Sequence, residues 1–286
     1  MPTPAEIKAR IRTGDDLWNA GDREGWLAHV RSYATTMRRE DPVGTPVKEG
    51  ADALEEVWDR SRPAVRQRRK VQYLFVCGQE AAAWVVTKAV VDGQTVWWHG
   101  AECTRFDADG TVHTRAFWEP PAERLDYLAW SAATGTPPTP GPGLPGGGVA
   151  PVESPEVTKA KLRRGYELYN FGTKEEWLAN MRADTTEPLL EDPIGAPLKR
   201  GWDLMSEAWD RAPARHRLRV IPEHIVVCGR EAAVLSMNAG TVQDKPMFMV
   251  SIDCSRRNED GSRHSRTFWE EPEGGLAYAR WAEHAE

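Results

Sequence analysis

The hydrophobic pattern of the first 60 residues has the spacing of helices. Apolar positions recur every three to four residues over Glu6–Trp18, and a turn at residues 20–22 places Asp22 where it can cap a second helix. Residues 51–60 form a third amphipathic stretch, with the apolar side chains on one side. The chain therefore begins with a predicted run of helices.

From about residue 70 the pattern changes to short segments rich in β-branched and aromatic residues. These are VQYLFVC, AAAWVVTKAVV, TVWWHGAECTRF and TVHTRAFWEP, with Asp-Gly turns at residues 92–93 and 109–110. Helices followed by an antiparallel meander predict an α+β domain. We expect a cone shape, in which the curved sheet wraps around the N-terminal helices and encloses a pocket.

This whole pattern occurs twice in the chain. EDPVGTPVKEG at residues 40–50 returns as EDPIGAPLKRG at residues 191–201, a shift of 191 − 40 = 151 that needs no gap. Between the copies lies TGTPPTPGPGLPGGGVAPVESP, in which Pro and Gly disfavour helix and strand. The sequence predicts two tandem domains, residues 1–133 and 156–286, a linker of residues 134–155, and packing of the copies as an internal pseudo-dimer.

Composition narrows the possible partners. Formal net charge is -6 and the Arg-rich stretches are offset by acidic residues, so nucleic acid is not an expected partner. The sequence shows neither a signal peptide nor a membrane span, which favours a cytoplasmic protein. The four cysteines are scattered without metal-ligand spacing, so we expect reduced thiols, and neither a metal nor a cofactor.

Two acidic residues in each copy are candidates for acid–base chemistry. Asp41 and Asp192 stand in the repeated E-D-P-x-G motif, although an Asp before Pro can simply stabilise a turn. Glu102 and Asp253 lie within otherwise apolar strands, where an unpaired ionised carboxylate would be costly. Alternation alone could instead point Glu102 and Asp253 toward solvent.

EDPVG together with ECTRFDADGTVHTRAFW resembles the ketosteroid isomerase and SnoaL-like branch of the nuclear-transport-factor-2-like (NTF2-like) superfamily. The resemblance implies that Asp41 and Asp192 are general bases. It also implies that Glu102 and Asp253 are kept protonated as hydrogen-bond donors. On that basis we expect burial to raise the pKa of Glu102 and Asp253.

The oxyanion-binding Tyr of that family does not carry over, because its position falls at about Gly14 and Gly165. In the second copy, Tyr166 and Tyr169 lie close enough along the helix to restore a phenol donor. The first copy has Asp15 and Trp18 at those positions. The two predicted sites are therefore not equivalent.

The tandem arrangement is similar to that of the epoxide hydrolase/cyclases of polyether biosynthesis and of pyran-forming enzymes. These enzymes place another Glu near the start of the strand after the third helix, where this chain has Glu223 in the second copy and Gln72 in the first. Large aromatic residues are expected in the core or in the pocket wall. They are Trp58, Trp98, Trp118, Trp209 and Trp269.

The leading hypothesis is a cyclase of polyketide natural-product biosynthesis. It would form cyclic ethers from a bulky apolar substrate, by acid–base catalysed epoxide opening or hydroxyl addition. A double-bond isomerase or dehydratase acting on a ketone, and a non-catalytic small-molecule carrier, remain open. If only one copy is active, Glu102 and the Trp97–Trp98 pair favour the first.

Overall fold

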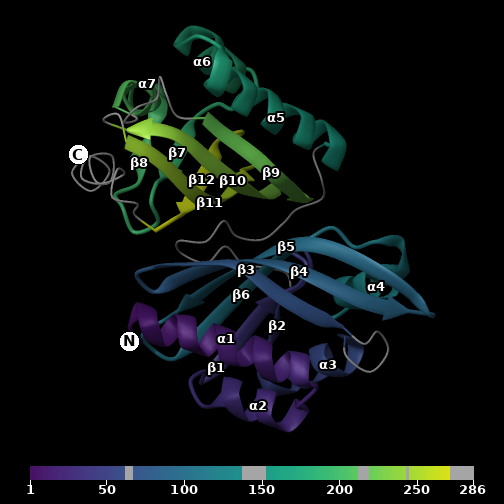
Figure 1. The fold of residues 1–286 in the computed structure, drawn as a ribbon. Coiled ribbons are helices and arrows are strands. Elements are labelled where there is room, and N and C mark those ends of the chain that lie inside the picture. Colours follow the sequence, from purple (N-terminus) through teal and green to yellow (C-terminus); the bar gives the residue numbers. More distant parts are fainter. Residues whose placement is uncertain (62–66, 137–152, 212–218, 243–244, 271–286) are drawn as a thin grey trace. The chain divides into compact units, whose positions relative to one another are not determined.

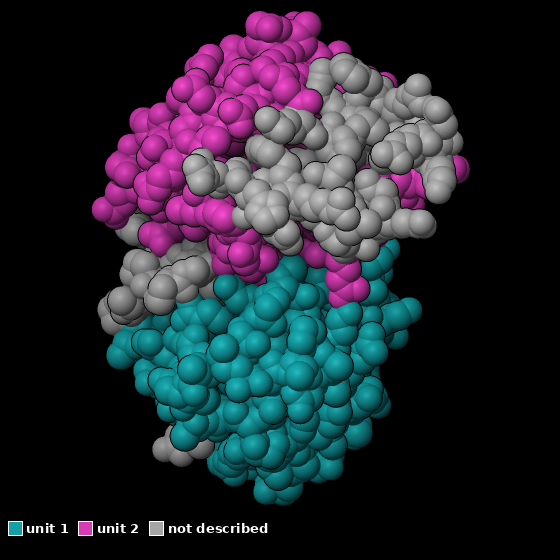
Figure 2. Space-filling model, turned by 90° about the vertical axis from the view of Figure 1, so that its left-hand side faces the viewer, with its two compact units in different colours: residues 1–150 teal, residues 151–286 magenta. Residues whose placement is uncertain are grey.

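The computed structural model describes residues 1–61, 67–136, 153–211, 219–242 and 245–270. The chain divides into two compact units, Met1–Ala150 and Pro151–Glu286 (Figure 2). We call them domain 1 and domain 2. Most of the predicted linker, residues 137–152, lies outside the described residues. The exact domain boundaries and the pseudo-dimer stay predictions.

Domain 1 begins with the predicted helices α1 (Pro4–Ala20), α2 (Arg23–Arg31) and α3 (Ala51–Ser61). Their ends follow from local chemistry. Thr3 and Glu6 form a capping box at the start of α1, which ends at Gly21 with φ of 78°. The Asp22 side chain accepts a hydrogen bond from the Gly25 amide and so caps α2, as predicted.

The sheet of domain 1 contains the four predicted strands and two short ones. The long strands β3 (Arg68–Cys77), β4 (Glu80–Val91), β5 (Gln94–Phe106) and β6 (Thr111–Trp118) form an antiparallel meander. The short strand β1 (Thr36–Glu40) pairs in parallel with β6 and antiparallel with β2 (Lys48–Glu49). The order is β2-β1-β6-β5-β4-β3, and the parallel β1–β6 pair makes the sheet mixed. The sequence pattern predicted only the antiparallel meander and missed β1 and β2.

Helices α1, α2 and α3 lie on one side of the curved long strands (Figure 1). After β6 the chain continues through η1 (Ala122–Arg124) and α4 (Leu125–Ala133). One hydrophobic cluster, Ile7, Ala81, Phe106 and Val112, fills the space between α1 and the sheet. Trp58 packs in a second aromatic group, with ring centroids 4.7 Å from Trp18 and 5.3 Å from Trp26.

Domain 2 repeats this order of elements. The helices are α5 (Pro155–Phe171), α6 (Lys174–Arg182) and α7 (Gly201–Arg211). The strands are β7 (Pro188–Glu191), β8 (Lys199–Arg200), β9 (Arg219–Cys228), β10 (Glu231–Val242), β11 (Lys245–Arg257) and β12 (Arg263–Phe268). Their order, β8-β7-β12-β11-β10-β9, is that of domain 1. The predicted α+β class is thus confirmed in both copies.

None of the four cysteines, all of them described, forms a disulfide, and three are buried. No described helix is both long and apolar enough to cross a membrane.

Candidate functional site

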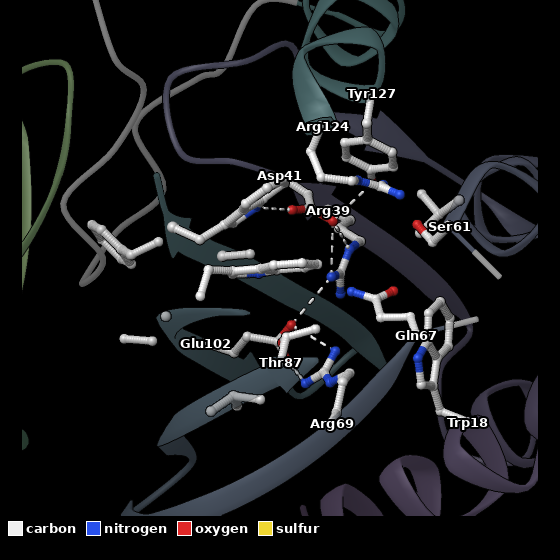
Figure 3. A pocket seen from close by; sticks show the side chains of 18 residues that line it. Trp18, Arg39, Asp41, Ser61, Gln67, Arg69, Thr87, Glu102, Arg124 and Tyr127 are labelled. Carbon is white, nitrogen blue, oxygen red and sulfur yellow. Dashed lines mark hydrogen bonds and ion pairs between the residues drawn. The ribbon is translucent and has the colours of Figure 1, made fainter. Parts of the chain in front are cut away.

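In domain 1 the predicted base lies directly after β1, inside a dense hydrogen-bond network. Asp41 is 6% exposed. Its Oδ1 accepts a 2.6 Å hydrogen bond from Trp118 Nε1 and its Oδ2 accepts one of 3.0 Å from the Tyr127 hydroxyl. Oδ2 also lies 3.0 Å from Arg39 Nη2. Both oxygens of the Asp41 carboxylate therefore have partners within domain 1 (Figure 3).

Glu102, at the middle of β5, forms ion pairs with two arginines. Arg69 donates to both carboxylate oxygens, at 2.9 and 2.7 Å, and Arg39 donates to Oε1 at 3.2 Å. Burial alone would raise the pKa of Glu102, but the guanidiniums of Arg69 and Arg39 together outweigh it and hold the pKa at about 2. Glu102 is therefore ionised, and the expectation of a neutral donor at this position was wrong.

The same network leaves little open space in domain 1. Asp15 Oδ1 lies 3.2 Å from Arg69 Nε, and burial raises the pKa of Asp15 to about 6. Arg39, Arg69 and the stacked rings of Trp98 and Trp118 leave a cavity of about 60 Å³. Ligand pockets usually measure about 300 to 1,000 Å³, so the domain 1 cavity is too small for a bulky molecule.

Domain 2 lacks every arginine of this network. At a shift of 151, Leu190 stands for Arg39, Val220 for Arg69 and Tyr166 for Asp15. Without these long charged side chains, a cavity of about 350 Å³ opens between the helices and the sheet. Much of its wall is apolar, and the larger contributors include Tyr169, Trp177, Trp209, Met205, Met249 and Trp269.

Asp253 lies in the wall of this cavity without a cationic partner among the described residues. Its Oδ2 accepts hydrogen bonds from the Ser236 hydroxyl at 2.8 Å and from the Tyr166 hydroxyl at 3.1 Å. Burial raises the pKa of Asp253 despite these hydrogen bonds, and burial also raises that of Tyr166 well above its usual value. For Asp253 the expected direction of the pKa shift is confirmed.

Asp192 follows β7 as Asp41 follows β1, and it also lines the cavity. Its Oδ1 accepts a 2.7 Å hydrogen bond from Trp269 Nε1, the counterpart of the Trp118 contact in domain 1. Asp192 is half-buried. The domain 2 cavity thus brings the Asp192 carboxyl group together with Tyr166 and Asp253, whose pKa values are raised by burial.

Two expectations from the sequence need correction, and a third is resolved. Trp58, expected in the core or in the pocket wall, packs among tryptophans and does not line the domain 1 cavity, whereas Trp98 and Trp118 do. Glu223 is the extra residue of a β-bulge opposite Leu235–Ser236; it is exposed and does not line the domain 2 cavity. The larger cavity lies in the second copy, although Glu102 and Trp97–Trp98 had favoured the first.

Sequence reasoning also missed Arg39, Arg69 and Tyr127. A signal for the two arginines was present, because aligning the copies at the shift of 151 places them opposite Leu190 and Val220. Such charged-for-apolar exchanges between two copies of one fold mark the positions where their interiors differ.

This geometry predicts that substitutions of Glu102 and of Asp253 have different effects on stability. We expect Glu102→Gln to lower the free energy of unfolding of domain 1 by about 3–5 kcal/mol, because it removes the anion that the buried Arg39 and Arg69 share and leaves them only Asp41 and Asp15. The matched variant Asp253→Asn should change stability far less, because Asp253 forms no ion pair with a described residue and the amide can still accept the hydrogen bonds from Ser236 and Tyr166. Urea unfolding at pH 7 measures both.

The contribution of ionised Glu102 to the stability of domain 1 depends on pH, and the direction of this dependence follows from its pKa. The pKa of Glu102 is lowered from 4.5 to about 2, so its contribution to stability is fully present above about pH 4.5 and is lost as the pH falls toward 2. Equal urea midpoints for Glu102→Gln and the unaltered protein at pH 7 would contradict the buried ion pair.

Comparisons with known proteins give matches to solved structures only. No family model matches the chain, and no curated protein matches it. The matches include Rv0760c from Mycobacterium tuberculosis in complex with estradiol-17beta-hemisuccinate, at 26% identity and a TM-score of 0.36, covering 41% of this chain and 95% of that one.

Two further matches have other functions. SalBIII, described as an epoxide hydrolase/cyclase-like enzyme in pyran ring formation in the polyether salinomycin, is 17% identical, with a TM-score of 0.35 and coverage of 40% and 92%. A computationally designed 17-OHP binder is 24% identical, with a TM-score of 0.35 and coverage of 39% and 90%. The helices and mixed sheet of each domain confirm the NTF2-like, SnoaL-like fold predicted from the motifs.

Proposed function

We propose that domain 2 is an acid–base enzyme that closes cyclic ether rings on an apolar substrate of polyketide type, by attack of a hydroxyl group on an epoxide. The observation that carries this proposal is the joint presence of Asp192, Asp253 and Tyr166 in the wall of one cavity of about 350 Å³. An apolar wall with a few converging polar groups is typical of a small-molecule site.

The reaction needs one proton acceptor and one proton donor. Asp192 accepts the proton of the attacking hydroxyl as the new C–O bond forms. The C–O bond of the epoxide breaks, and its oxygen takes a proton from the protonated form of Asp253, while the Tyr166 hydroxyl donates its hydrogen bond to the carboxylate that Asp253 becomes. The product is an isomer of the substrate, and proton exchange with water returns both acids to their starting states.

The apolar wall contributes by holding the flexible chain in a reactive conformation. Intramolecular attack requires the hydroxyl oxygen and the epoxide carbon to lie about 3–3.5 Å apart. Aromatic and Met side chains can enforce such a fold by burial alone. In this proposal domain 1 has no turnover, since Arg39 and Arg69 occupy the corresponding space.

An experiment on the purified chain tests the proposal. An apolar epoxy alcohol is incubated with the protein in H₂¹⁸O, and the products are analysed by mass spectrometry. Ring closure gives a product of unchanged mass without ¹⁸O. A diol that carries ¹⁸O would show hydrolysis instead, and unchanged substrate would contradict an enzymatic role toward epoxides.

A second function is favoured by the Tyr166–Asp253 contact itself. Protonated Asp253, held by the Tyr166 hydroxyl, is also suited to donating a hydrogen bond to an enolate, with Asp192 moving a proton between carbon atoms. This reading predicts deuterium incorporation next to the carbonyl of an unsaturated ketone in D₂O. Binding of either molecule without turnover would favour the non-catalytic carrier.

The cavity itself can be tested by an exchange between the copies. We expect Met249→Trp, which copies Trp98 of domain 1, to fill the domain 2 cavity and weaken binding of an apolar ligand by about 10-fold or more. The matched variant Trp98→Met should leave the dissociation constant unchanged. Fluorescence titration measures both, and an effect of Trp98→Met alone would place the binding site in domain 1.

A further inference from the structure

The two domains differ a second time, at the end of the fold away from Trp118 and Trp269. In domain 1 this end is the apolar cluster around Phe106 and Val112. A shift of 151 replaces Phe106 by Arg257 and Val112 by Arg263. The charged interior residues therefore lie in different places in the two domains. In domain 1 they surround Glu102, and this end is apolar. In domain 2 they lie at this end.

The charged end of domain 2 holds more cations than its acids neutralise. Lys161 Nζ lies 2.7 Å from Asp184 Oδ1, and Arg257 Nη1 lies 3.3 Å from the same oxygen. Glu153 is the other acid, and it contacts Lys161 and Arg257. With Arg263, three cations share these two carboxylates.

Arg263 is the most weakly held member of this cluster. Its Nη1 lies 3.5 Å from Asp184 Oδ2, a longer distance than in the ion pairs of Lys161 and Arg257 with Asp184 and Glu153. Burial lowers the pKa of Arg263, which shows that its charge is poorly compensated by its surroundings. A buried guanidinium in this state favours an added anion.

Arg263 also lines the cavity that contains Asp253. It lies on β12 on the same face as Ser265, Thr267 and Trp269, which line that cavity too. Arg257, its partner in the β11–β12 register, lines only the small neighbouring cavity of about 30 Å³. Arg263 is thus the cation of this cluster that a ligand in the larger cavity can reach.

We propose that Arg263 binds an anionic group, such as a carboxylate, on the ligand of the domain 2 cavity, so that the substrates are apolar acids. This inference rests on the proposed substrate cavity. The planar guanidinium offers a two-pronged contact to a carboxylate. Recognition at Arg263 fixes one end of the ligand and thereby the position of the reacting oxygen beside Asp253 and Tyr166.

Two fluorescent probes that differ in an anionic group test the proposal without requiring turnover. They are 1-anilinonaphthalene-8-sulfonate and the uncharged N-phenyl-1-naphthylamine. We expect Arg263→Met to raise the dissociation constant of the sulfonate by about 10-fold or more, because a charge-assisted contact is lost. The dissociation constant of the uncharged probe should stay unchanged.

The controls separate this inference from the proposed function. Arg256→Met, on the other face of β11, should leave both dissociation constants unchanged, and Arg263→Lys should retain part of the preference for the sulfonate. If Arg263→Met does not fold, Arg263→Gln removes the charge and keeps a donor for Asp184. Equal effects of the Arg263 variants on both probes, or none, overturn the proposal.

Binding of both probes to the cavity variant Met249→Trp shows where the probes bind. If Met249→Trp blocks both probes and the Arg263 variants do not discriminate between them, the cavity stands and only the anion site fails. If neither probe binds, or if Met249→Trp has no effect on either, the anion site and the substrate cavity both fail.

Discussion

Asp192→Asn is expected to lower turnover by about 10²- to 10⁴-fold, the usual contribution of a positioned general base. The amide has nearly the same volume and can still accept the hydrogen bond from Trp269 Nε1, but it cannot take a proton from the substrate. Folding should therefore be nearly unchanged. Initial rates with an epoxy alcohol, together with thermal unfolding, measure the two effects separately.

The chain supplies its own control for this variant. Asp41→Asn makes the same change in the other copy, where the carboxylate contacts Arg39, Trp118 and Tyr127. We expect it to lower the stability of domain 1 and to leave turnover unchanged. Loss of turnover in Asp41→Asn with full activity in Asp192→Asn would reverse the assignment of the two domains.

Asp253→Asn is expected to lower the rate of epoxide opening by about 10²- to 10³-fold, because the amide cannot transfer a proton to the leaving oxygen. For an isomerase the expected loss is smaller, since the amide N–H can still donate a hydrogen bond to an enolate. The size of the loss therefore separates the two proposed reactions. Rates on an epoxy alcohol and on an unsaturated ketone provide the measurement.

The pH dependence of activity tests independently whether Asp253 is the proton donor. Because burial raises its pKa, the neutral acid persists above its usual range, and activity should fall as the pH rises through the raised value. Asp253→Asn should abolish this alkaline limb. The Tyr166 hydrogen bond favours the ionised form, so Tyr166→Phe should move the limb to higher pH. An unchanged profile in both variants would contradict the role of Asp253.

The local order of the fold could be read from the sequence because its signals are local. The helix cap at Asp22 and the β-rich pattern of the long strands each depend on a few neighbouring residues. The internal repeat then doubled the evidence for each element. Strand β1 was missed because a short strand of half-buried residues, TMRRE, carries no alternation of its own.

The sequence by itself determined that the fold is duplicated. It also determined that each copy carries the Asp of an E-D-P-x-G motif and a second acidic residue in its third long strand. Only the tertiary structure decided which acid is ionised. Arg39 and Arg69 lie on β1 and β3, and each reaches Glu102 on β5 across one intervening strand. Periodicity along one strand holds no information about such a contact.

The same reason explains which copy holds the cavity. Leu190 and Val220 are unremarkable positions in a sequence, and their importance comes from the space that the missing arginines leave beside Asp253. Glu223 shows the converse, because the acid that the sequence offered at this position is itself the extra residue of a bulge in β9 and is exposed. Cavity volume and protonation depend on side chains that meet across the sheet, which only the folded chain brings together.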